Sequence, residues 1–290
     1  MKWVFLPAAV FWVSVTPVHG RLVVSGPLDR GPKCGYLSVD TTSRHSAFSK
    51  GPCVHDHLHV VVKNAPWWPV YVGRRLAFRY EDGSTSRPVT AEYGNTLWVY
   101  DVLTQRGPIL QRWSLRTGRL VRELRFPVKL WRPVITANAA GAWLMGAPNG
   151  GEDGSATAAL WHASHRVTAV HRSERAAMWM TGHGRTLWVE TIAGTNTFKL
   201  WRYDGTRGKL LSTHAPPALW SASYGNGALW GASARYCGKR VHALRIDART
   251  GTTTTVADAP LLDCNQAGAG TYFRGRFWFV NGNELERVPA

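Results

Sequence analysis

The chain has few cysteines, few acidic residues and no long apolar run. Four cysteines occur in 290 residues, and 18 acidic residues stand against 35 lysines and arginines. A membrane-spanning helix needs about 18 or more uninterrupted apolar residues, and no such run follows the N-terminus. The hydrophobic fraction of 44% is nevertheless that of a chain with a full core. These features exclude a disordered chain and a membrane-spanning one.

The first twenty residues have the order of a secretory signal peptide. A basic Lys2 is followed by an apolar stretch from Trp3 to Val15 and then by turn-prone residues up to Gly20. The apolar part is short for a bilayer span. We expect residues 1–20 to be a signal peptide and 21–290 to be a single exported domain, secreted or periplasmic, with no membrane span after cleavage. The alternative is an ordinary N-terminal core strand.

The cysteines fall into two sequence-local pairs and not into a C-x-x-C pattern. In an exported chain an even count favours disulfides over metal ligation. Of the three possible connectivities we favour Cys34 with Cys53 and Cys237 with Cys264.

The formal net charge of +17 predicts attraction to anionic surfaces or polymers. The basic residues never run longer than two in succession, as in Arg74-Arg75 and Lys239-Arg240. A tail or stripe for nucleic acid is therefore not visible, and no specific nucleic-acid partner is expected.

An internal repeat runs through the sequence. Tryptophan follows glycine and an apolar residue in similar octamers, 42 to 48 residues apart, at Trp98, Trp143, Trp188, Trp230 and Trp278. Each octamer is preceded by a segment rich in small residues and followed by an apolar-polar alternation that a turn such as RTG interrupts. One unit thus contains four short extended segments in about 45 residues, with almost no helical periodicity.

Four strands at this period predict an all-β chain folded as a β-propeller. Six four-stranded blades account for residues 21–290. The last unit stops after its third strand, so we expect Arg21 to Gly26 to pair beside Glu284 to Val288 and close the ring, which hides two sheet edges. Seven blades would require two units between Arg21 and Arg75, where a second tryptophan-type strand is not visible.

The segments GNTLWVYD, GRTLWVET, LWRYDGTRG and LRIDARTG resemble the tandem repeats of bacterial propellers of the streptogramin-lyase-like and NHL/YncE-like kind. The resemblance covers nearly the whole of residues 21–290. It implies the architecture and leaves the activity open, because such blades support lyases, lactonases and binding modules. The lyases use a histidine and a glutamate near a divalent cation, and Asp101 and Glu190 lie near where such acids would fall. IDARTG is also similar to blades of PQQ-dependent dehydrogenases, but the following tryptophan is missing, and no cofactor is expected.

The stretch CVHDHLHVVV at Cys53 brings His55, His57 and His59 into one short segment. On a strand these three would point the same way, but they would span roughly 13 Å, too far for one ion. By alignment His59 takes the place of a blade tryptophan. We therefore interpret the cluster as structural and expect no metal; the alternative is a metal site with a further ligand from elsewhere.

Candidate ligand-binding residues lie where loops between blades, and loops joining the second and third strands, share one face. By alignment Arg87, Arg132, Arg175 and Asn265 enter inner strands there, and three arginines on one rim would bind an anion. Trp67 and Trp68 are expected in a loop on the same face, where exposed aromatic rings could stack on a sugar or a protein partner. The alternative for the arginines is that each pairs with a neighbouring backbone carbonyl or acid. The alternative for the two tryptophans is that they pack the loop onto the blade.

No nucleophile elbow, zinc-protease motif, phosphate loop or dinucleotide fingerprint is present, and catalytic residues are unknown. The sequence predicts an exported binding or scaffold module for an anionic cell-envelope component or a protein. The alternative is a metal-dependent lyase or lactonase-like hydrolase with its site at the channel mouth.

Overall fold

The structure is a computed structural model of the chain. It describes residues 2–5, 14–18, 21–27, 33–43, 45–52, 54–55, 60–62, 67–72, 75–81, 89–101, 107–148, 158–173, 175–193, 197–215, 218–219, 221–233, 238–262 and 267–289. All regular elements in these ranges are β-strands, which confirms the all-β prediction. In the described ranges no helix is both long and apolar enough for a membrane span.

The strands divide between two compact units. Unit 1 comprises Met1–Leu58 and Pro216–Ala290. Its strands are β1 (Lys2–Phe5), β2 (Ser14–Val18), β3 (Arg21–Pro27), β4 (Lys33–Val39), β5 (Ser46–Pro52), β6 (Val54–His55), β22 (Ala222–Gly225), β23 (Ala228–Ser233), β24 (Arg240–Asp247), β25 (Thr253–Pro260), β26 (Ala267–Phe273), β27 (Arg276–Asn281) and β28 (Glu284–Pro289).

Unit 2 comprises His59–Ala215. Its strands are β7 (Val60–Val62), β8 (Trp67–Val72), β9 (Arg75–Glu81), β10 (Val89–Tyr93), β11 (Thr96–Asp101), β12 (Ile109–Ser114), β13 (Arg119–Arg125), β14 (Leu130–Asn138), β15 (Gly141–Pro148), β16 (Ala158–Ala163), β17 (Val167–Ser173), β18 (Ala176–His183), β19 (Thr186–Ala193), β20 (Thr197–Asp204) and β21 (Leu210–His214).

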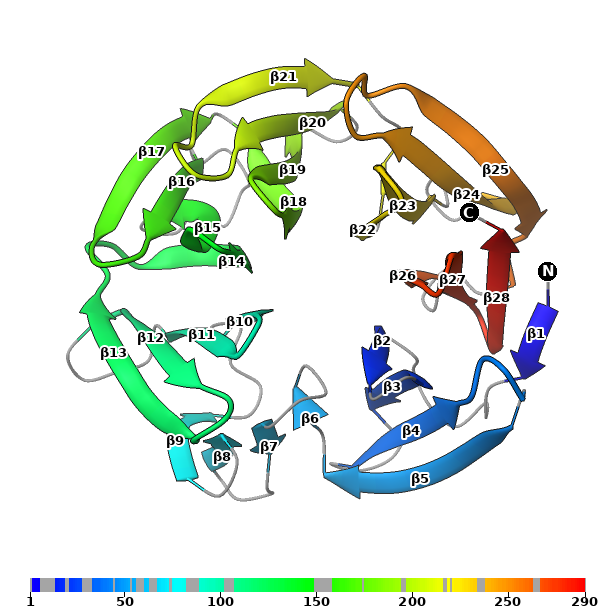
Figure 1. The fold of residues 1–290 in the computed structure, drawn as a ribbon, viewed down its shortest axis with the longest axis horizontal. Helices are drawn as coiled ribbons and strands as arrows, with labels where there is room; N and C mark the ends of the chain where they lie inside the picture. Colours follow the sequence, from blue (N-terminus) through cyan, green and yellow to red (C-terminus); the bar gives the residue numbers. More distant parts are fainter. Residues whose placement is uncertain are drawn as a thin grey trace. The chain divides into compact units, whose positions relative to one another are not determined.

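The sheets are antiparallel and mostly follow chain order, as β14 to β17 show in Figure 1. Burial changes from strand to strand within a sheet. In β11 the residues from Leu97 to Asp101 are all buried, whereas the edge strand β13 is exposed along nearly its whole length. A strand buried on both faces has a continuous apolar sequence instead of an alternating one. This explains the run LWVY in the repeat.

The repeated tryptophans are on the second strand of their sheets and are buried, as the alignment predicts. Their exposed fractions are at most 4%, in the set Trp98, Trp143, Trp188, Trp230 and Trp278. Each ring removes roughly 150–250 Å² from water, which makes these residues the largest single apolar contributions to the core.

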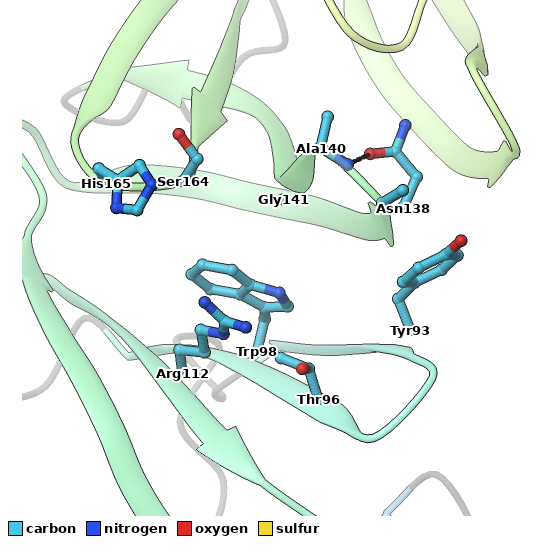
Figure 2. A pocket seen from close by; sticks show the side chains of 10 residues that line it. Tyr93, Thr96, Trp98, Arg112, Asn138, Ala140, Gly141, Ser164 and His165 are labelled. Atoms are coloured by element: carbon cyan, nitrogen blue, oxygen red, sulfur yellow. Dashed lines mark hydrogen bonds between the residues drawn. The ribbon is translucent and has the colours of Figure 1, made fainter.

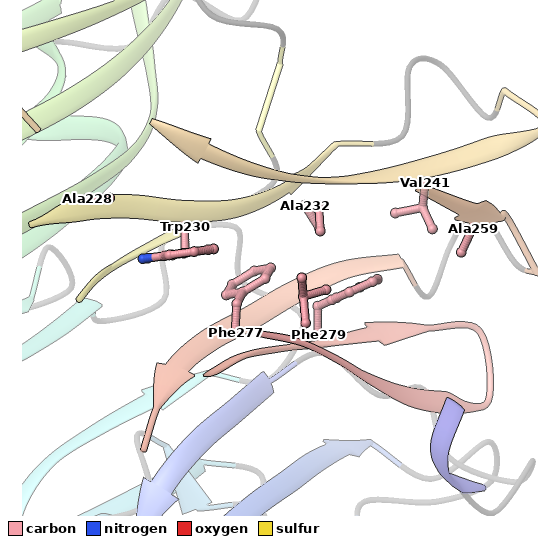
Figure 3. Close-up of a cluster of buried hydrophobic side chains, with 9 residues drawn as sticks. Ala228, Trp230, Ala232, Val241, Ala259, Phe277 and Phe279 are labelled. Atoms are coloured by element: carbon pink, nitrogen blue, oxygen red, sulfur yellow. The ribbon is translucent and has the colours of Figure 1, made fainter. Parts of the chain in front are cut away.

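Neighbouring sheets within a unit pack through these rings. In unit 1, Trp230 on β23 lies beside Phe277 on β27, with ring centroids 6.3 Å apart, and Phe277 stacks on Phe279 at 5.7 Å (Figure 3). Ala228 and Ala232 lie on either side of Trp230 along β23, and their small side chains allow β27 to approach closely. The repeat therefore alternates large and small side chains across the interface between sheets.

The turn motif of the repeat has a local hydrogen-bonding reason. In the turn after β24, Asp247 Oδ1 accepts hydrogen bonds from the backbone N of Arg249 at 2.9 Å and of Thr250 at 2.8 Å. Gly251 then adopts a φ of +74°, which glycine reaches without strain. The sequence D-A-R-T-G is thus a turn between the third and fourth strands.

The last sheet is completed by a different N-terminal segment from the one expected. Strand β1 pairs with β28, with Val4 opposite Leu285 and Phe5 opposite Glu284, and the two lie side by side in Figure 1. The expected segment, Arg21–Gly26, lies in β3 and pairs with β2 and β4. A strand from the N-terminus does complete the sheet, but it comes from within residues 1–20.

The described strands form seven sheets where six were expected. Residues 14–52 make one sheet, β2 to β5, and β7 to β9 belong to another. The first has no tryptophan on its second strand, where Leu22 and Val24 are fully buried instead. A search for tryptophan-type strands therefore missed it, and it also begins inside the expected signal peptide.

Several predictions fall on residues that the structure does not describe. Cys53, Cys237, Cys264, His57 and His59 lie outside the described residues, and only the backbone is described for Cys34 in β4 and His55 in β6. The two disulfides and the structural role of the histidines stay predictions.

Candidate anion-binding site

The structure describes one side chain of the expected ligand-binding set. Arg87 and Asn265 lie outside the described residues, and only the backbone is described for Arg132 in β14 and for Trp67 and Trp68. Both tryptophans begin β8, with Trp67 opposite Glu81, so they lie in a strand and not in the expected loop. The next strand, Arg75–Glu81, is the edge strand β9 of the same sheet.

Arg175 is the described member of that set, and two of its nitrogen atoms donate to neighbouring groups. Its Nε donates to Thr191 Oγ1 at 3.1 Å, and its Nη2 donates to the carbonyl oxygen of Thr197. These bonds join the start of β18 to β19 and β20. These contacts are those of the alternative considered for Arg175, pairing with neighbouring groups, and its role in ligand binding stays a prediction.

The acids considered for catalysis are buried in their sheets. Glu190 is fully buried and its Oε2 accepts a hydrogen bond from Trp179 Nε1 at 2.9 Å. Asp101 is 3% exposed at the end of β11. Within the described part of the chain, no group of three His, Cys, Asp or Glu side chains is placed to hold a metal ion.

A pocket of about 370 Å³ lies in unit 2, where sheet β10–β13 meets sheet β14–β17. Figure 2 shows Trp98 and Arg112 on the first sheet, facing Ser164 and His165 on the second. The pocket is also lined by Tyr93, Thr96, Asn138, Ala139, Ala140 and Gly141. Trp98 and Arg112 lie within strands β11 and β12, and the other lining residues lie in or beside turns that join first to second or third to fourth strands. These turns are at the edge opposite to the predicted loops.

The turn at Ala139 and Ala140 is fixed by side chains beneath it. Asn138 Oδ1 accepts a hydrogen bond from Ala140 N at 2.9 Å, and Asn138 Nδ2 donates to Gly205 O at 2.9 Å. At Gly141 an added Cβ would lie 2.2 Å from Ala163 O, so only glycine allows this approach. One wall of the pocket is therefore rigid.

His162 supports the same wall. Its Nε2 lies 3.0 Å from Ala140 O, and its ring stacks on Trp143 with centroids 4.3 Å apart. Burial lowers the pKa of His162, which keeps the ring uncharged at neutral pH. A neutral ring is consistent with stacking in this apolar interior.

The sheet that forms the opposite wall has two arginines in one row, of which Arg112 lines the pocket. Trp98 on β11, Arg112 on β12 and Arg122 on β13 stand directly opposite one another in the sheet register. The guanidinium carbon of Arg112 lies 5.7 Å from the centre of the Trp98 ring. Arg122 Nη1 lies 3.1 Å from His165 Nδ1 and donates to His165 O at 3.3 Å. Both arginines therefore lie on the side of the sheet that faces the pocket.

The turns around the pocket are strongly basic. We call the six turns joining first to second and third to fourth strands of sheets β10–β13, β14–β17 and β18–β21 the turn face. The exposed basic and imidazole side chains in or beside these turns are Arg116, Arg119, His165, Arg166, His183, Arg185, Arg207 and Lys209. A cluster of side chains with the same charge attracts partners of opposite charge over several ångströms.

One acidic residue lies in these turns, and its carboxylate is used locally. Asp204 Oδ1 accepts hydrogen bonds from the backbone N of Thr206 at 2.8 Å and of Arg207 at 3.2 Å. These bonds lower the pKa of Asp204 and keep it ionised. The turn face therefore has a large excess of positive charge.

Sequence reasoning missed this site for a definable reason. Both residues can be found in the sequence: Arg112 is the arginine of L-Q-R-W, and Arg122 is the arginine of L-V-R-E. Neither motif shows that the two residues face each other, because the register also depends on a β-bulge between Arg112 and Trp113. The pairing becomes visible when the ladder is known.

No protein-family model matches the sequence, and no curated protein matches it either. Solved structures do resemble it. A chain in the crystal structure of the mitotic checkpoint complex is similar over 99% of this chain and 90% of its own, with a TM-score of 0.60 at 11% identity. An uncharacterized protein from Listeria monocytogenes is similar over 99% and 95% respectively, with a TM-score of 0.51 at 8% identity.

BamB from Moraxella catarrhalis is a more distant likeness, with a TM-score of 0.48 at 13% identity over 99% of this chain and 89% of that one. At such low identity the two likenesses with a TM-score above 0.5 indicate a fold and not an activity. Together with the repeated four-stranded sheets, the checkpoint-complex likeness shows that the chain has a β-propeller-type fold.

Proposed function

We propose that this protein is an exported binding or scaffold module whose turn face recognises a partner with an acidic surface. The observation that carries the proposal is the charge of this face: exposed basic side chains occupy the turns, and the one acid is bonded within its own turn. Arginine forks bind carboxylate, phosphate and sulfate groups through paired hydrogen bonds.

A protein is the partner we favour. The similar chain in the mitotic checkpoint complex is part of a complex. An anionic envelope polymer is the second possibility, because the overall charge of +17 would attract either. Export is proposed from the N-terminal sequence, and kinship with streptogramin-lyase-like or NHL/YncE-like propellers from the repeats quoted above.

The proposal is tested with the full chain and three immobilised polymers: polyglutamate, dextran sulfate and neutral dextran. We expect binding to both anionic polymers, none to dextran, and a marked loss of affinity between 50 and 200 mM salt, because exposed charges are screened over about 10 Å at these ionic strengths. Preference for polyglutamate supports a protein partner and preference for dextran sulfate an envelope polymer. Equal retention on dextran would contradict the proposal.

A further inference from the structure

The Trp98–Arg112–Arg122 row is a variation on a feature that other sheets share. A basic or imidazole residue stands opposite the repeated tryptophan in each, as Arg202 does for Trp188 and Arg245 does for Trp230. The next strand then brings a hydroxyl residue, Ser212 or Thr254 respectively. At Arg112 the next strand brings a second arginine instead.

Two guanidinium groups in this arrangement lack a counter-charge. Residues directly opposite on antiparallel strands have Cβ atoms about 4.5–5.5 Å apart, and like charges at that separation repel. Neither Arg112 nor Arg122 contacts a carboxylate among the described residues, and the buried Nε of Arg112 has no hydrogen-bond partner there. Buried donors in folded proteins are usually paired.

The space beside this row suits a small anionic group. The pocket has room for one such group and the atoms that carry it, and the hydroxyl side chains of Thr96 and Ser164 line it together with Arg112. His165 holds the Arg122 guanidinium at the pocket edge. Guanidinium and hydroxyl donors converge here, which is the donor set that oxyanions require.

We propose that this pocket binds a single oxyanion, a carboxylate, phosphate or sulfate group, through Arg112 and Arg122. The inference rests on the proposed function and deepens it, because it names the group by which an anionic partner is anchored. The surrounding basic turns supply long-range attraction, and the arginine pair supplies the short-range contact. The ligand neutralises the repulsion between the two arginines.

The competing explanation is that Arg112 only packs on Trp98, as arginines opposite tryptophan do elsewhere in the chain. Arg245 provides the matched control, since it is also partly buried opposite a tryptophan but has Thr254 in place of a second arginine. If Arg112 has a purely structural role, the Arg112→Gln and Arg245→Gln variants should bind anions with similar affinity.

The test is calorimetric titration of the full chain with inorganic phosphate, sulfate and N-acetylglutamate, which distinguishes the three sources of the oxyanion. We expect one site per chain for at least one probe. Arg112→Gln and Arg122→Gln should each weaken it about tenfold or more, whereas Arg245→Gln should change it less than twofold. If Arg112→Gln fails to fold, Arg112→Lys, which keeps the charge without the fork, should still weaken binding.

The results separate this inference from the proposed function. If none of the probes binds, or if the Arg112 and Arg245 variants bind equally well, the pocket assignment is wrong even when dextran sulfate still binds the turn face. If a probe binds at Arg112 while neither anionic polymer binds, the pocket stands and the proposed function is wrong.

Discussion

Aspartates at the start of three turns show how single residues hold this fold. Asp40, Asp204 and Asp247 each precede a turn between the third and fourth strands of a sheet. Each accepts hydrogen bonds from two backbone N–H groups, two and three residues later. These bonds favour the ionised carboxylate, so the pKa of each group is lowered.

The lowered pKa of Asp247 makes its contribution pH-dependent. A carboxyl whose pKa is lower in the folded state stabilises the fold above its unfolded pKa of about 3.9, and the effect is lost as pH falls through the folded value. We therefore expect the melting temperature of the protein to exceed that of Asp247→Asn between pH 5 and 7. The difference should shrink below about pH 4. A difference that is unchanged at pH 3 would contradict the assignment.

The sequence predicted a structural feature correctly where that feature depends on residues close together in the chain. Tryptophan after glycine and an apolar residue identified five buried second strands, and D-A-R-T-G identified the turn at Asp247, because both signals depend on near neighbours. The Arg112–Arg122 pair depends on which residues of two strands lie opposite, and sequence spacing does not determine that. The pocket therefore lies at the edge of the sheets opposite to the loops in which ligand-binding residues were predicted, and binding at those loops stays a prediction.

At the scale of whole strands, β1 and β2 decide how the N-terminal segment is understood. β1 covers the edge of β28, and β2 pairs with β3 through five residue pairs. Val15 of β2 is 7% exposed and packs in a cluster with Leu22 and Trp278. Cleavage after Gly20, the expected export step, would remove β1 and β2. Strands β28 and β3 would then lose a paired strand, and Leu22 and Trp278 would lose the contact with Val15.

We expect a chain that begins at Arg21 to be less stable than the full chain. Loss of the Val15 contact alone costs about 1.5–3 kcal/mol, and each kcal/mol lowers the melting temperature by about 2–4 °C in a chain of this size. The shorter chain should therefore melt at least about 3 °C lower in calorimetry. Identical melting temperatures would show that β1 and β2 contribute nothing to the folded protein.

The edge of the sheet that contains β24 and β25 favours the second disulfide. Arg240 is opposite Pro260, and Leu261 N donates to Lys239 O at 3.0 Å. Cys237 lies two residues before Lys239, and Cys264 lies three residues after Leu261. Closing a loop of this size contributes about 3–4 kcal/mol through the unfolded state.

Peptide mapping without reduction should yield one peptide pair that joins Cys237 to Cys264 and another that joins Cys34 to Cys53. For the second pair the ladder is also suggestive, because Cys34 is opposite Gly51, two residues before Cys53. A bond between Cys34 and Cys264 would show that both assignments are wrong.

The elements predicted best were those with a repeated tryptophan. The sheet β2–β5 was missed because Leu22 and Val24 fill the position that tryptophan occupies elsewhere. Burial between neighbouring sheets requires an apolar side chain there and not one residue type. The sequence pattern was therefore sufficient for the class of fold and insufficient for the number of sheets.

At the scale of the molecule, charge is the property that links fold to function. The same antiparallel topology that stacks the tryptophans also brings alternate turns to one edge of each sheet, and in unit 2 these turns carry the exposed basic residues. The net charge of +17 predicted an anionic partner but not its location. The location that we propose for it rests on which turns share an edge.

The most direct test of this account compares charges in the turns with charges at the other end of the sheets. Arg166→Gln, Arg185→Gln and Arg207→Gln together remove three exposed charges from the turn face, whereas Arg125→Gln, Arg172→Gln and Lys199→Gln remove three exposed charges elsewhere on strands β13, β17 and β20. The two variants have the same net charge. Binding to dextran sulfate at 50 mM salt is measured for both.

Exposed charge contacts contribute about 0.2–1 kcal/mol each, so we expect the turn-face variant to bind about tenfold more weakly than the wild-type chain and the control variant to stay within about threefold. Equal losses in the two variants would show that attraction depends on net charge alone, and would contradict a dedicated binding face.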